Sequence, residues 1–396
     1  MQNRPLLPIF LIVAVDVLGL TIILPLLPFY AEHFGASPAL VGMLVSTYAL
    51  CQLISGPMLG RFSDHMGRRP LLLVSQVGTF IGFLILANAW ALWVVFLSRV
   101  IDGLTAGNLS LAQAYISDVT TPEKRAKSFA VIGIAFGIGF LVGPAISGYL
   151  SQYGYAVPIY VAAGLSFSSI VCTYFLLPRH KPHQDESAPR KFTVLDWGNY
   201  IRFFRKPGLG PLLWQFFAFT TAFSGFMAGF ALFAERRYTW HGHPFGTREV
   251  GYVYAFVGLL GIIFQGGLVG RLVHLLGERR MVRIAWVVAV AGYAWLGLTW
   301  TIPWLLAAAA VQSFGAGSLR PVLTSLITQT AGRSETGAVL GLTQSLMAVS
   351  QIVAPFIAGL LIQKGLLVSW AMFPAAVSLI GLLLSIEIRR PNRAAQ

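Results

Sequence analysis

Twelve apolar segments, each about 20 residues or longer, alternate with short polar connections along this 396-residue chain. A helix of about 20 apolar residues is long enough to cross the hydrocarbon core of a bilayer. The pattern therefore predicts an all-α membrane protein with twelve transmembrane helices. The segments lie at 6–31, 40–60, 70–90, 91–116, 127–150, 156–178, 208–234, 249–275, 280–300, 302–328, 336–363 and 365–388.

A polar stretch divides these segments into two sets of six. It covers residues 179–207, holds His, Lys, Arg, Asp, Glu and Ser residues with three prolines, and is too short for a separate domain. We expect an N-terminal six-helix bundle at 1–178, a cytoplasmic linker at 179–207 with a surface helix around Val194–Arg205, and a C-terminal six-helix bundle at 208–396.

Two internal repeats relate the halves. Gly60–Arg69 and Gly270–Arg279 both follow the pattern G-R-x-x-[D/H]-x-x-G-x-R, 210 residues apart. Val142–Leu150 and Val353–Leu361 match at an offset of 211. The repeats predict two pseudo-symmetric bundles in parallel orientation, with a binding site between them near the bilayer midplane, as in secondary transporters.

Composition and charge agree with a membrane protein. The mean hydropathy is +0.72 and only 11% of residues are charged, which excludes a soluble domain of this length. Of the 28 Lys and Arg residues, four fall in predicted outer loops and two inside spans, which leaves 22 on the side of the N-terminus. This bias predicts cytoplasmic termini, and it explains the net charge of +14 without a nucleic-acid partner.

Neither the cysteines nor the histidines indicate a cofactor. Cys51 and Cys172 fall in apolar segments, where packed thiols are expected more than a disulfide. His241 and His243 in an outer loop lack the further ligands that zinc requires, so we expect no metal. The first apolar segment lacks a small-residue cleavage site, and we expect a retained span there and not a signal peptide.

Four formal charges lie deep in predicted spans: Asp16, Arg99, Asp102 and Arg320. Charges are costly in hydrocarbon, so each is a candidate functional residue. Asp16 is about ten residues into its span, roughly 15 Å deep. It is either a carboxylate that exchanges a proton between the two sides or a structural group hydrogen-bonded to neighbouring helices.

Arg99 and Asp102 are three residues apart and can share one helix face. They form either a self-compensating pair or part of the proton-coupling machinery. Arg320 either binds an anionic substrate group or pairs with a carboxylate. Polar side chains in other spans are candidates for lining a substrate cavity: Asn108, Gln113, Gln215, Gln265 and Gln344.

Two further groups are candidates for a conformational switch. The connection after the second span contains Gly60, Asp64, Gly67, Arg68 and Arg69; Asp64 lies at the interface, too shallow for a proton site in the membrane. We expect this connection to keep itself cytoplasmic and to attract the start of the eleventh span. The fifth span carries Gly139, Gly143 and Pro144, a close-packing face with a local opening.

These motifs resemble those of the major facilitator superfamily, in particular its twelve-helix drug/proton antiporters, similar to the tetracycline/proton antiporters. Gly60–Arg69 looks like the family's G-x-x-x-D-x-x-G-R-R signature, and Asp16–Pro28 looks like its first-helix motif. Leu97–Gly103 looks like the fourth-helix arginine motif, and Gly139–Gly148 resembles the fifth-helix motif associated with antiport. The resemblance implies the major facilitator fold, a coupling role for Arg99, and a switch role for the Gly60–Arg69 connection.

Two positions depart from the tetracycline exporters. Gly261 stands where they carry a histidine in the eighth helix, and Arg320 lies in a tenth helix that looks uncharged in them. The departures favour a substrate other than tetracycline.

The sequence as a whole predicts a proton-coupled exporter of small amphipathic compounds or drugs that works by alternating access, a monomer in the inner membrane whose partners are its substrate, protons and the bilayer. An exporter of an anionic metabolite or siderophore is the alternative within transport, and a channel or receptor is the alternative of another class. No H-E-x-x-H, G-x-S-x-G or P-loop is found, so neither an enzyme nor ATP-driven transport is expected.

Overall fold

The computed structural model describes residues 6–119, 122–178, 197–332 and 335–387. Twelve helices of this part are long and apolar enough to cross a membrane, which confirms the predicted number of spans. Those of the first half are built from α1 (Leu6–His33), α2 (Pro38–Met66), α3 (Arg68–Ala87), α4 (Leu92–Leu104), α5 (Asn108–Val119), α6 (Pro122–Leu150) and α7 (Ala156–Leu176). The remaining helical elements are η1 (Ser151–Tyr153), α8 (Trp197–Arg205), α9 (Gly210–Arg237), α10 (Thr247–Ile263), η2 (Phe264–Leu268), α11 (Val269–Leu276), α12 (Glu278–Leu298), α13 (Ile302–Ala331), α14 (Thr336–Gln363) and α15 (Leu367–Glu387).

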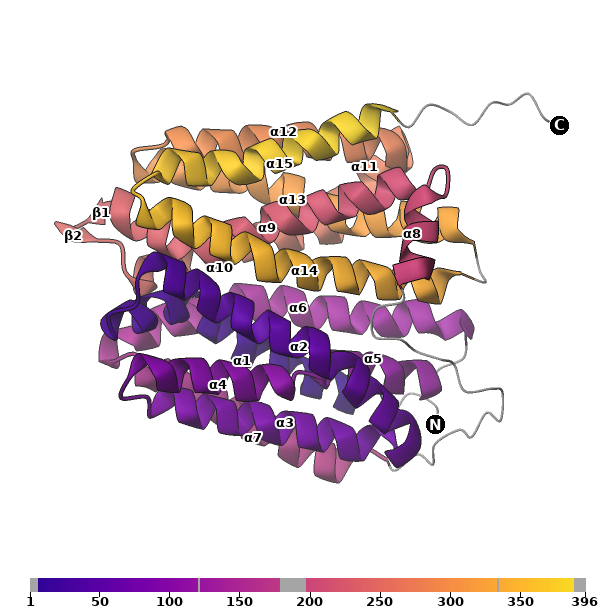
Figure 1. Ribbon diagram of the computed structural model, residues 1–396, viewed down its shortest axis with the longest axis horizontal. Helices are drawn as coiled ribbons and strands as arrows, with labels where there is room; N and C mark the ends of the chain where they lie inside the picture. Colours follow the sequence, from indigo (N-terminus) through magenta and orange to yellow (C-terminus); the bar gives the residue numbers. More distant parts are fainter. Residues whose placement is uncertain (1–5, 120–121, 179–196, 333–334, 388–396) are drawn as a thin grey trace. The chain divides into compact units, whose positions relative to one another are not determined.

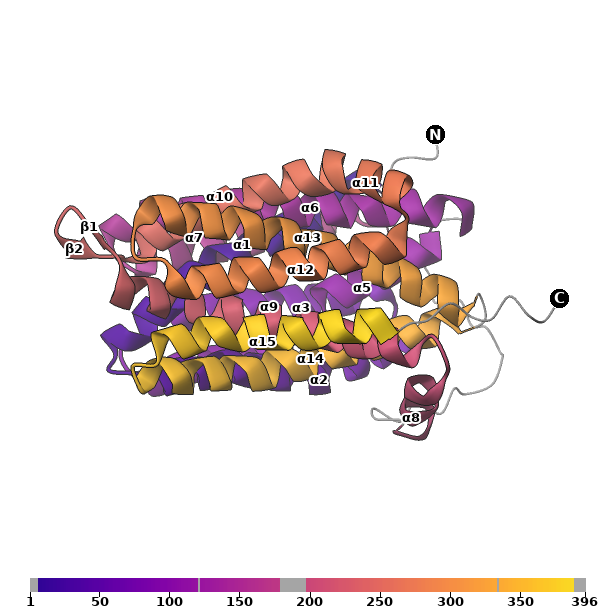
Figure 2. The same ribbon diagram turned by 90° about the horizontal axis from the view of Figure 1, so that it is seen from above.

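Contacts between residues divide the chain into two compact units. The first comprises Met1–Val194 with Ala234–Leu259, and the second comprises Leu195–Phe233 with Leu260–Gln396. Within the first unit α1 packs along α6 and α7, and α3 packs along α4 and α7 (Figure 1). Within the second unit α12 lies between α13 and α15, its principal neighbours (Figure 2).

Small residues allow helices of the second unit to approach closely. A Cβ at Gly292 of α12 would lie 2.7 Å from the backbone of Gln312 in α13, and one at Gly315 would lie 2.7 Å from the backbone nitrogen of Ala289. Helix association in a bilayer depends on such close van der Waals packing, because lipid supplies no hydrophobic drive between helices.

The repeated connection is more helical than its sequence predicts. We expected the spans to end at residue 60 and to begin again at residue 70, with a short connection between them, but α2 continues to Met66 and α3 begins at Arg68, so Gly67 alone interrupts the helices. Gly67 adopts φ 94°, and its equivalent Gly277 between α11 and α12 adopts φ 78°. A single glycine suffices because left-handed backbone is accessible to it without steric cost, and charged residues on a helix end can extend beyond the hydrocarbon.

The fourth span, predicted as continuous over 91–116, is interrupted at Thr105–Gly107. Ser75 of α3 bridges the interruption: its hydroxyl donates to the Thr105 carbonyl and accepts from the Gly107 amide at 2.9 Å. Backbone freed at membrane depth must find such partners, because no water is available in the hydrocarbon core.

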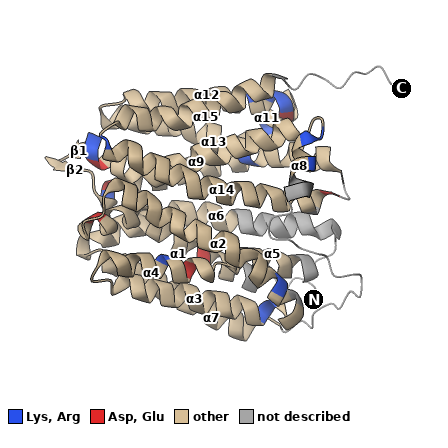
Figure 3. Ribbon diagram, in the orientation of Figure 1, with Lys and Arg blue, Asp and Glu red and all other residues tan. Residues whose placement is uncertain are grey.

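Two other segments depart from regular helix. Residues Phe264–Leu268 form a π-helical turn inside the eighth span. The loop between α9 and α10 contains a short hairpin of Thr239–Trp240 and His243–Pro244, closed through His241 and Gly242, both with positive φ. The expected surface helix is present as Trp197–Arg205. Figure 3 shows most of the coloured charged residues near helix ends, with a few inside the first unit.

Candidate functional site

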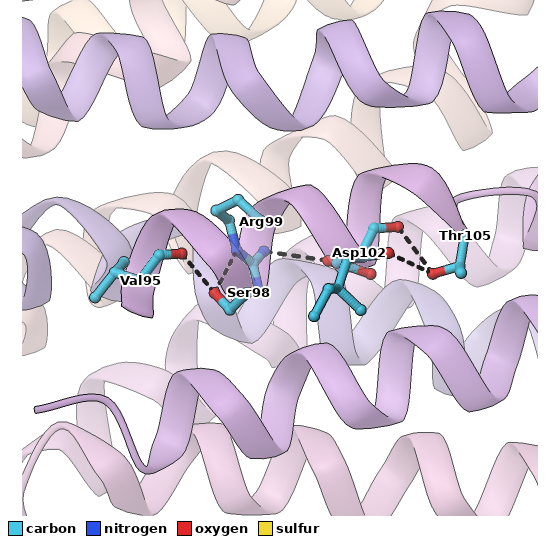
Figure 4. A network of polar contacts seen from close by, with 6 residues as sticks. Val95, Ser98, Arg99, Asp102 and Thr105 are labelled. Atoms are coloured by element: carbon cyan, nitrogen blue, oxygen red, sulfur yellow. Dashed lines mark hydrogen bonds and ion pairs between the residues drawn. The ribbon is translucent and has the colours of Figure 1, made fainter. Parts of the chain in front are cut away.

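A buried ion pair lies within the first unit, at mid-length of the fourth span. Arg99 Nη1 is 3.2 Å from Asp102 Oδ2, and both side chains are about 5% exposed. Figure 4 shows the two side chains pointing toward one another along α4. The sequence spacing predicted this contact, because residues three apart lie on one helix face.

The surroundings of the pair fit a polar group inside an apolar bundle. The Ser98 hydroxyl donates to the Val95 carbonyl at 2.7 Å and accepts from Arg99 Nε at 3.4 Å. The guanidinium of Arg99 lies 6.0 Å from the centre of the Phe83 ring, within cation–π range. Gly82 of α3 leaves room for Asp102, since a Cβ there would come within 3.0 Å of Asp102 Cβ.

Asp16 of α1 belongs to the same cluster. Its carboxylate interacts electrostatically with Asp102, and the hydroxyl of Ser169 and the amide of Gln76 are its polar neighbours. Gln76 Nε2 donates to Ser169 Oγ at 2.8 Å, which joins α3 to α7 beside the carboxylate. Tyr48 of α2 interacts electrostatically with Asp16, Arg99 and Asp102, so five helices of the first unit contribute.

Two charged atoms of this cluster are left without partners. Among the described residues, neither Asp16 Oδ1 nor Arg99 Nη2 has a hydrogen bond, although both atoms are buried. With both carboxylates ionised the cluster holds two negative charges and one positive charge. One bound proton would make it neutral, which a low-dielectric interior favours.

The fifth span packs its glycines against the helix that carries Asp16. A Cβ at Gly139 would lie 2.5 Å from Val17, and one at Gly143 would collide with Thr21. Thr21 Oγ1 in turn donates to the Gly139 carbonyl at 2.8 Å. The backbone beside Pro144 meets Gly251 of α10, where a Cβ would also come within 3.0 Å of Gly148.

In the second unit, Arg320 of α13 is exposed. It makes no ion pair or hydrogen bond through its side chain with the residues that the structure describes. Gln265 of the π-helical turn comes close to the same face of α13: a Cβ at Gly317, three residues before Arg320, would lie 3.5 Å from Gln265 Nε2. These two predicted substrate residues are therefore brought to one surface of the second unit.

The other predicted cavity residues have different surroundings. Gln215 is fully buried and accepts a hydrogen bond from the Trp286 indole at 3.1 Å, as a packed core amide does. Gln344 is exposed on α14, and Gln113 is half-buried on α5. Asn108 begins α5 at the interruption, and its Oδ1 is buried without a partner among the described residues.

The repeated connection is fastened to its own unit. Arg68 Nη1 donates to Ser63 Oγ at 2.5 Å. Arg69 donates to the Tyr174 carbonyl of α7 and lies 5.5 Å from the centre of that ring. A Cβ at Gly60 would meet nothing within 4 Å. The side chain of Asp64 lies outside the described residues, and so do residues 333–334 at the start of the eleventh span that we expected to attract it.

Sequence analysis missed Gln76, Ser75 and Ser169, each neutral and polar within an apolar run. The uncharged candidates were chosen from other spans as cavity-lining residues, and not as partners of the buried charges. Gln76 is the sole glutamine of the third predicted span, and that signal would have found it. In the part of the chain that the structure describes, no group of three or more His, Cys, Asp or Glu residues is arranged to hold a metal ion. Both cysteines are free thiols.

Comparisons with known proteins cover nearly the whole chain. The family model of the Major Facilitator Superfamily matches residues 9–299 and 266–396. The tetracycline resistance protein, class E, of Escherichia coli is 30% identical over 368 residues, which is 90% of this chain and 87% of that protein. Multidrug resistance protein 2 of Bacillus subtilis is 24% identical over 375 residues, covering 92% and 90% of the two chains.

Solved structures share the fold. The human organic anion transporter MFSD10 (TETRAN) is similar with a TM-score of 0.74 and 23% identity, over 97% of this chain and 99% of that one. A mutant of the nucleoside transporter NupG gives a TM-score of 0.81 at 13% identity, over 97% of this chain and 100% of that one. At these identities the likeness establishes the arrangement of helices and nothing about substrates.

Proposed function

This chain belongs to the Major Facilitator Superfamily, and we propose that it is a proton-coupled exporter of small amphipathic compounds, with cytoplasmic termini, in the inner membrane. That it is a multi-pass membrane transporter and not an enzyme follows from the family and from the twelve spans. The direction of transport, the coupling ion and the substrate class are our proposal.

The observation that carries the proposal is the buried cluster of two carboxylates and one arginine in the first unit. Asp102 has Arg99 at 3.2 Å, and Asp16 interacts electrostatically with Asp102. A cluster with one excess negative charge in a low-dielectric bundle is stabilised by a proton and destabilised by its loss. A transporter can use that difference if the two protonation states favour different exposures of the cavity.

The roles follow from the contacts. Asp16 takes up and releases the proton, since its neighbours Gln76 and Ser169 are neutral and no ion pair has to break. Arg99 and Asp102 respond to that charge change: the free Nη2 of Arg99 supplies an unused donor when a carboxylate changes its charge. The glycines of α6, packed on α1 beside Asp16, transmit the change to the fifth span.

The comparisons support an exporter of drug-like compounds. Tetracycline resistance proteins and a multidrug resistance protein cover about nine tenths of this chain. Gly261 and Arg320 differ from what we expect of a tetracycline site, so we propose an amphipathic compound other than tetracycline as the main substrate.

A second candidate substrate is an anionic amphipathic compound. Arg320 favours it, since an exposed guanidinium without a counterion in the described part of its unit is available to a carboxylate or sulfonate. Gln265 on the facing π-helical turn adds a donor for the same group. We propose these two residues as the anion-recognising part of the cavity.

Purified protein in vesicles with an imposed pH gradient tests the proposal. Cationic, neutral and anionic amphipathic compounds are supplied outside inside-out oriented vesicles whose lumen is acidic. We expect at least one class to accumulate against its own concentration gradient and to leave again when an ionophore dissipates the pH gradient. Transport that is unaffected by the gradient for all three classes would contradict proton coupling.

A further inference from the structure

The surface helix α8 and Glu335, which precedes α14, line an open basic pocket that the transport proposal does not use. The pocket has a volume of about 550 Å3 and is lined by Ile201, Arg202, Arg205, Lys206 and Glu335. All of these residues belong to the second unit. Three cations face one carboxylate, so the pocket carries excess positive charge.

Glu335 forms ion pairs with only two of the three cations. Its carboxylate accepts from Arg202 Nη2 at 2.7 Å and from Lys206 Nζ at 2.6 Å. Arg205, exposed on the last turn of α8, has no ion pair or hydrogen bond through its side chain among the residues described. Its guanidinium is therefore free for an anion that enters the pocket, and a guanidinium binds phosphate oxygens in a bidentate manner.

The position of α8 identifies the source of that anion. Arg205 lies five residues before Gly210, where the spanning helix α9 begins, so the pocket is at membrane-surface level. Within the second unit α8 runs crosswise to α9 and α14 (Figure 1). Such a helix, with cations beside apolar residues, is typical of one that lies in the lipid headgroup region.

Apolar side chains continue the pocket toward the acyl chains. Ile201 is 48% exposed and Trp214 of α9 is 50% exposed, while the ring of Phe204 lies 4.9 Å from that of Trp214. Phe203, on another side of α8, is buried against the unit. A free phosphate ion gains no binding energy from these apolar groups, whereas a phospholipid contacts both the apolar groups and the cations.

We propose that this pocket binds the headgroup of an anionic phospholipid, with its phosphate on Arg205 and its upper acyl chain against Ile201 and Trp214. Glu335 limits the affinity, because it competes with the phosphate for Arg202 and Lys206. The same bias of Lys and Arg that sets the topology supplies the attraction to an anionic leaflet.

Native mass spectrometry of the purified full-length protein, titrated with phosphatidylglycerol or phosphatidylcholine, tests the proposal. We expect preferential binding of phosphatidylglycerol, weakened about tenfold in Arg205→Gln because a charge-assisted contact is lost. Arg283→Gln is the matched control, since it removes an exposed charge of α12 outside the pocket, and it should leave binding unchanged. Glu335→Gln should strengthen binding several-fold because it releases two cations.

Three results would overturn the site. They are equal binding of the two lipids by the unaltered protein, equal losses in Arg205→Gln and Arg283→Gln, and displacement of phosphatidylglycerol by inorganic phosphate at the same concentration. The last result would assign the pocket to free phosphate. Retained binding by Arg205→Gln with weakened binding by Glu335→Gln would reverse the assigned roles and also count against the proposal.

Discussion

The two buried carboxylates of the first unit, Asp16 and Asp102, differ in the charge of their neighbouring side chains. Asp102 has the guanidinium of Arg99 at 3.2 Å, whereas the neighbours of Asp16 are the neutral Gln76 and Ser169. A carboxylate with neutral neighbours can gain a proton without leaving a buried cation unpaired, and breaking a buried pair is strongly destabilising. This difference is the reason for assigning proton exchange to Asp16 and the response to Arg99.

Replacement of Asp16 by Asn should separate transport from its energy source. The amide is nearly the same size but cannot exchange a proton at physiological pH, so we expect accumulation driven by a pH gradient to be lost. Downhill exchange of the same compound across the vesicle membrane should persist, and equal protein yield with equal thermal stability is the control for folding. An Asn variant that still concentrates the compound would assign coupling to another group.

Replacement of Arg320 by Gln should affect substrates according to their charge. Removal of an unpaired guanidinium eliminates its charge-assisted contact with an anion, so we expect the KM for anionic compounds to rise roughly tenfold or more. The KM for neutral compounds should change little. Gln344→Ala, at another exposed position of the second unit, is the comparison variant. Equal changes for anionic and neutral substrates would mean that Arg320 has a structural role.

Which residues of the buried cluster could be predicted from the sequence depended on their formal charge. Asp16, Arg99 and Asp102 were each found because a charge inside an apolar run is conspicuous, and the structure brings all three together. Gln76 and Ser169 were not found, because a neutral polar residue in a span costs little and is common. Which of them faces a carboxylate depends on how α1, α3 and α7 pack, and no local pattern specifies that.

Among the elements, the contact of α6 with α1 is the most sensitive to side-chain size. We expect Gly143→Ala to lower the free energy of unfolding by about 1–3 kcal/mol, because the new methyl group collides with Thr21. Gly164→Ala on α7 is the control: its Cβ would meet nothing within 4 Å, so it should be neutral or slightly stabilising. Thermal unfolding in detergent measures both, and equal melting temperatures would contradict the close contact.

The ion pairs of Glu335 with Arg202 and Lys206 tether α8 to the start of α14, and we expect this tether to weaken in acid. Hydrogen bonds from Lys206, and then from Arg202, hold the pKa of Glu335 below its ordinary value of 4.5. A lowered folded-state pKa means that the tether stabilises fully above that ordinary value and is lost as the pH falls through the lowered one. The contribution is small, since exposed ion pairs are weak.

Amide hydrogen exchange of α8 checks this dependence after correction for intrinsic rates. Exchange should be slow at pH 7 and should accelerate in the acid range below about pH 4.5, where Glu335 becomes protonated. Glu335→Gln should show the faster exchange already at pH 7. Glu278→Gln, which alters contacts to Ser325 and Gln329 instead, should not. Identical profiles for the unaltered protein and Glu335→Gln would show that the tether contributes nothing.

The helices themselves were largely predictable from hydropathy, but their irregularities were not. A window of about 20 residues averages over the interruption at Thr105–Gly107 and over the π-helical turn Phe264–Leu268. The helix ends at the Gly60–Arg69 connection were predicted incorrectly for the opposite reason. Charged residues indicate exposure to water, but they do not end a helix. Only Gly67, with its positive φ, ends it.

On the scale of the whole molecule, the motifs of the first half resembled those of the family before any comparison, and the match over residues 9–299 and 266–396 confirms the family. The interrupted connection is repeated in structure as well, since Gly67 and Gly277 each separate two helices. Among the described residues the buried cluster is not repeated: Asp16, Arg99 and Asp102 lie deep in spans of the first unit, whereas the charge deep in a predicted span of the second unit is Arg320. We therefore propose a division of labour, with proton exchange in the first half and anion recognition in the second.

Proton release from the purified protein tests the central claim most directly. A transported compound is added to protein in weakly buffered detergent solution near neutral pH, and a pH indicator records the protons released. Because one proton neutralises the buried cluster, we expect release of up to about one proton per protein molecule. The double variant Asp16→Asn, Asp102→Asn should release none while it still binds the compound. Undiminished release by that variant would contradict the account.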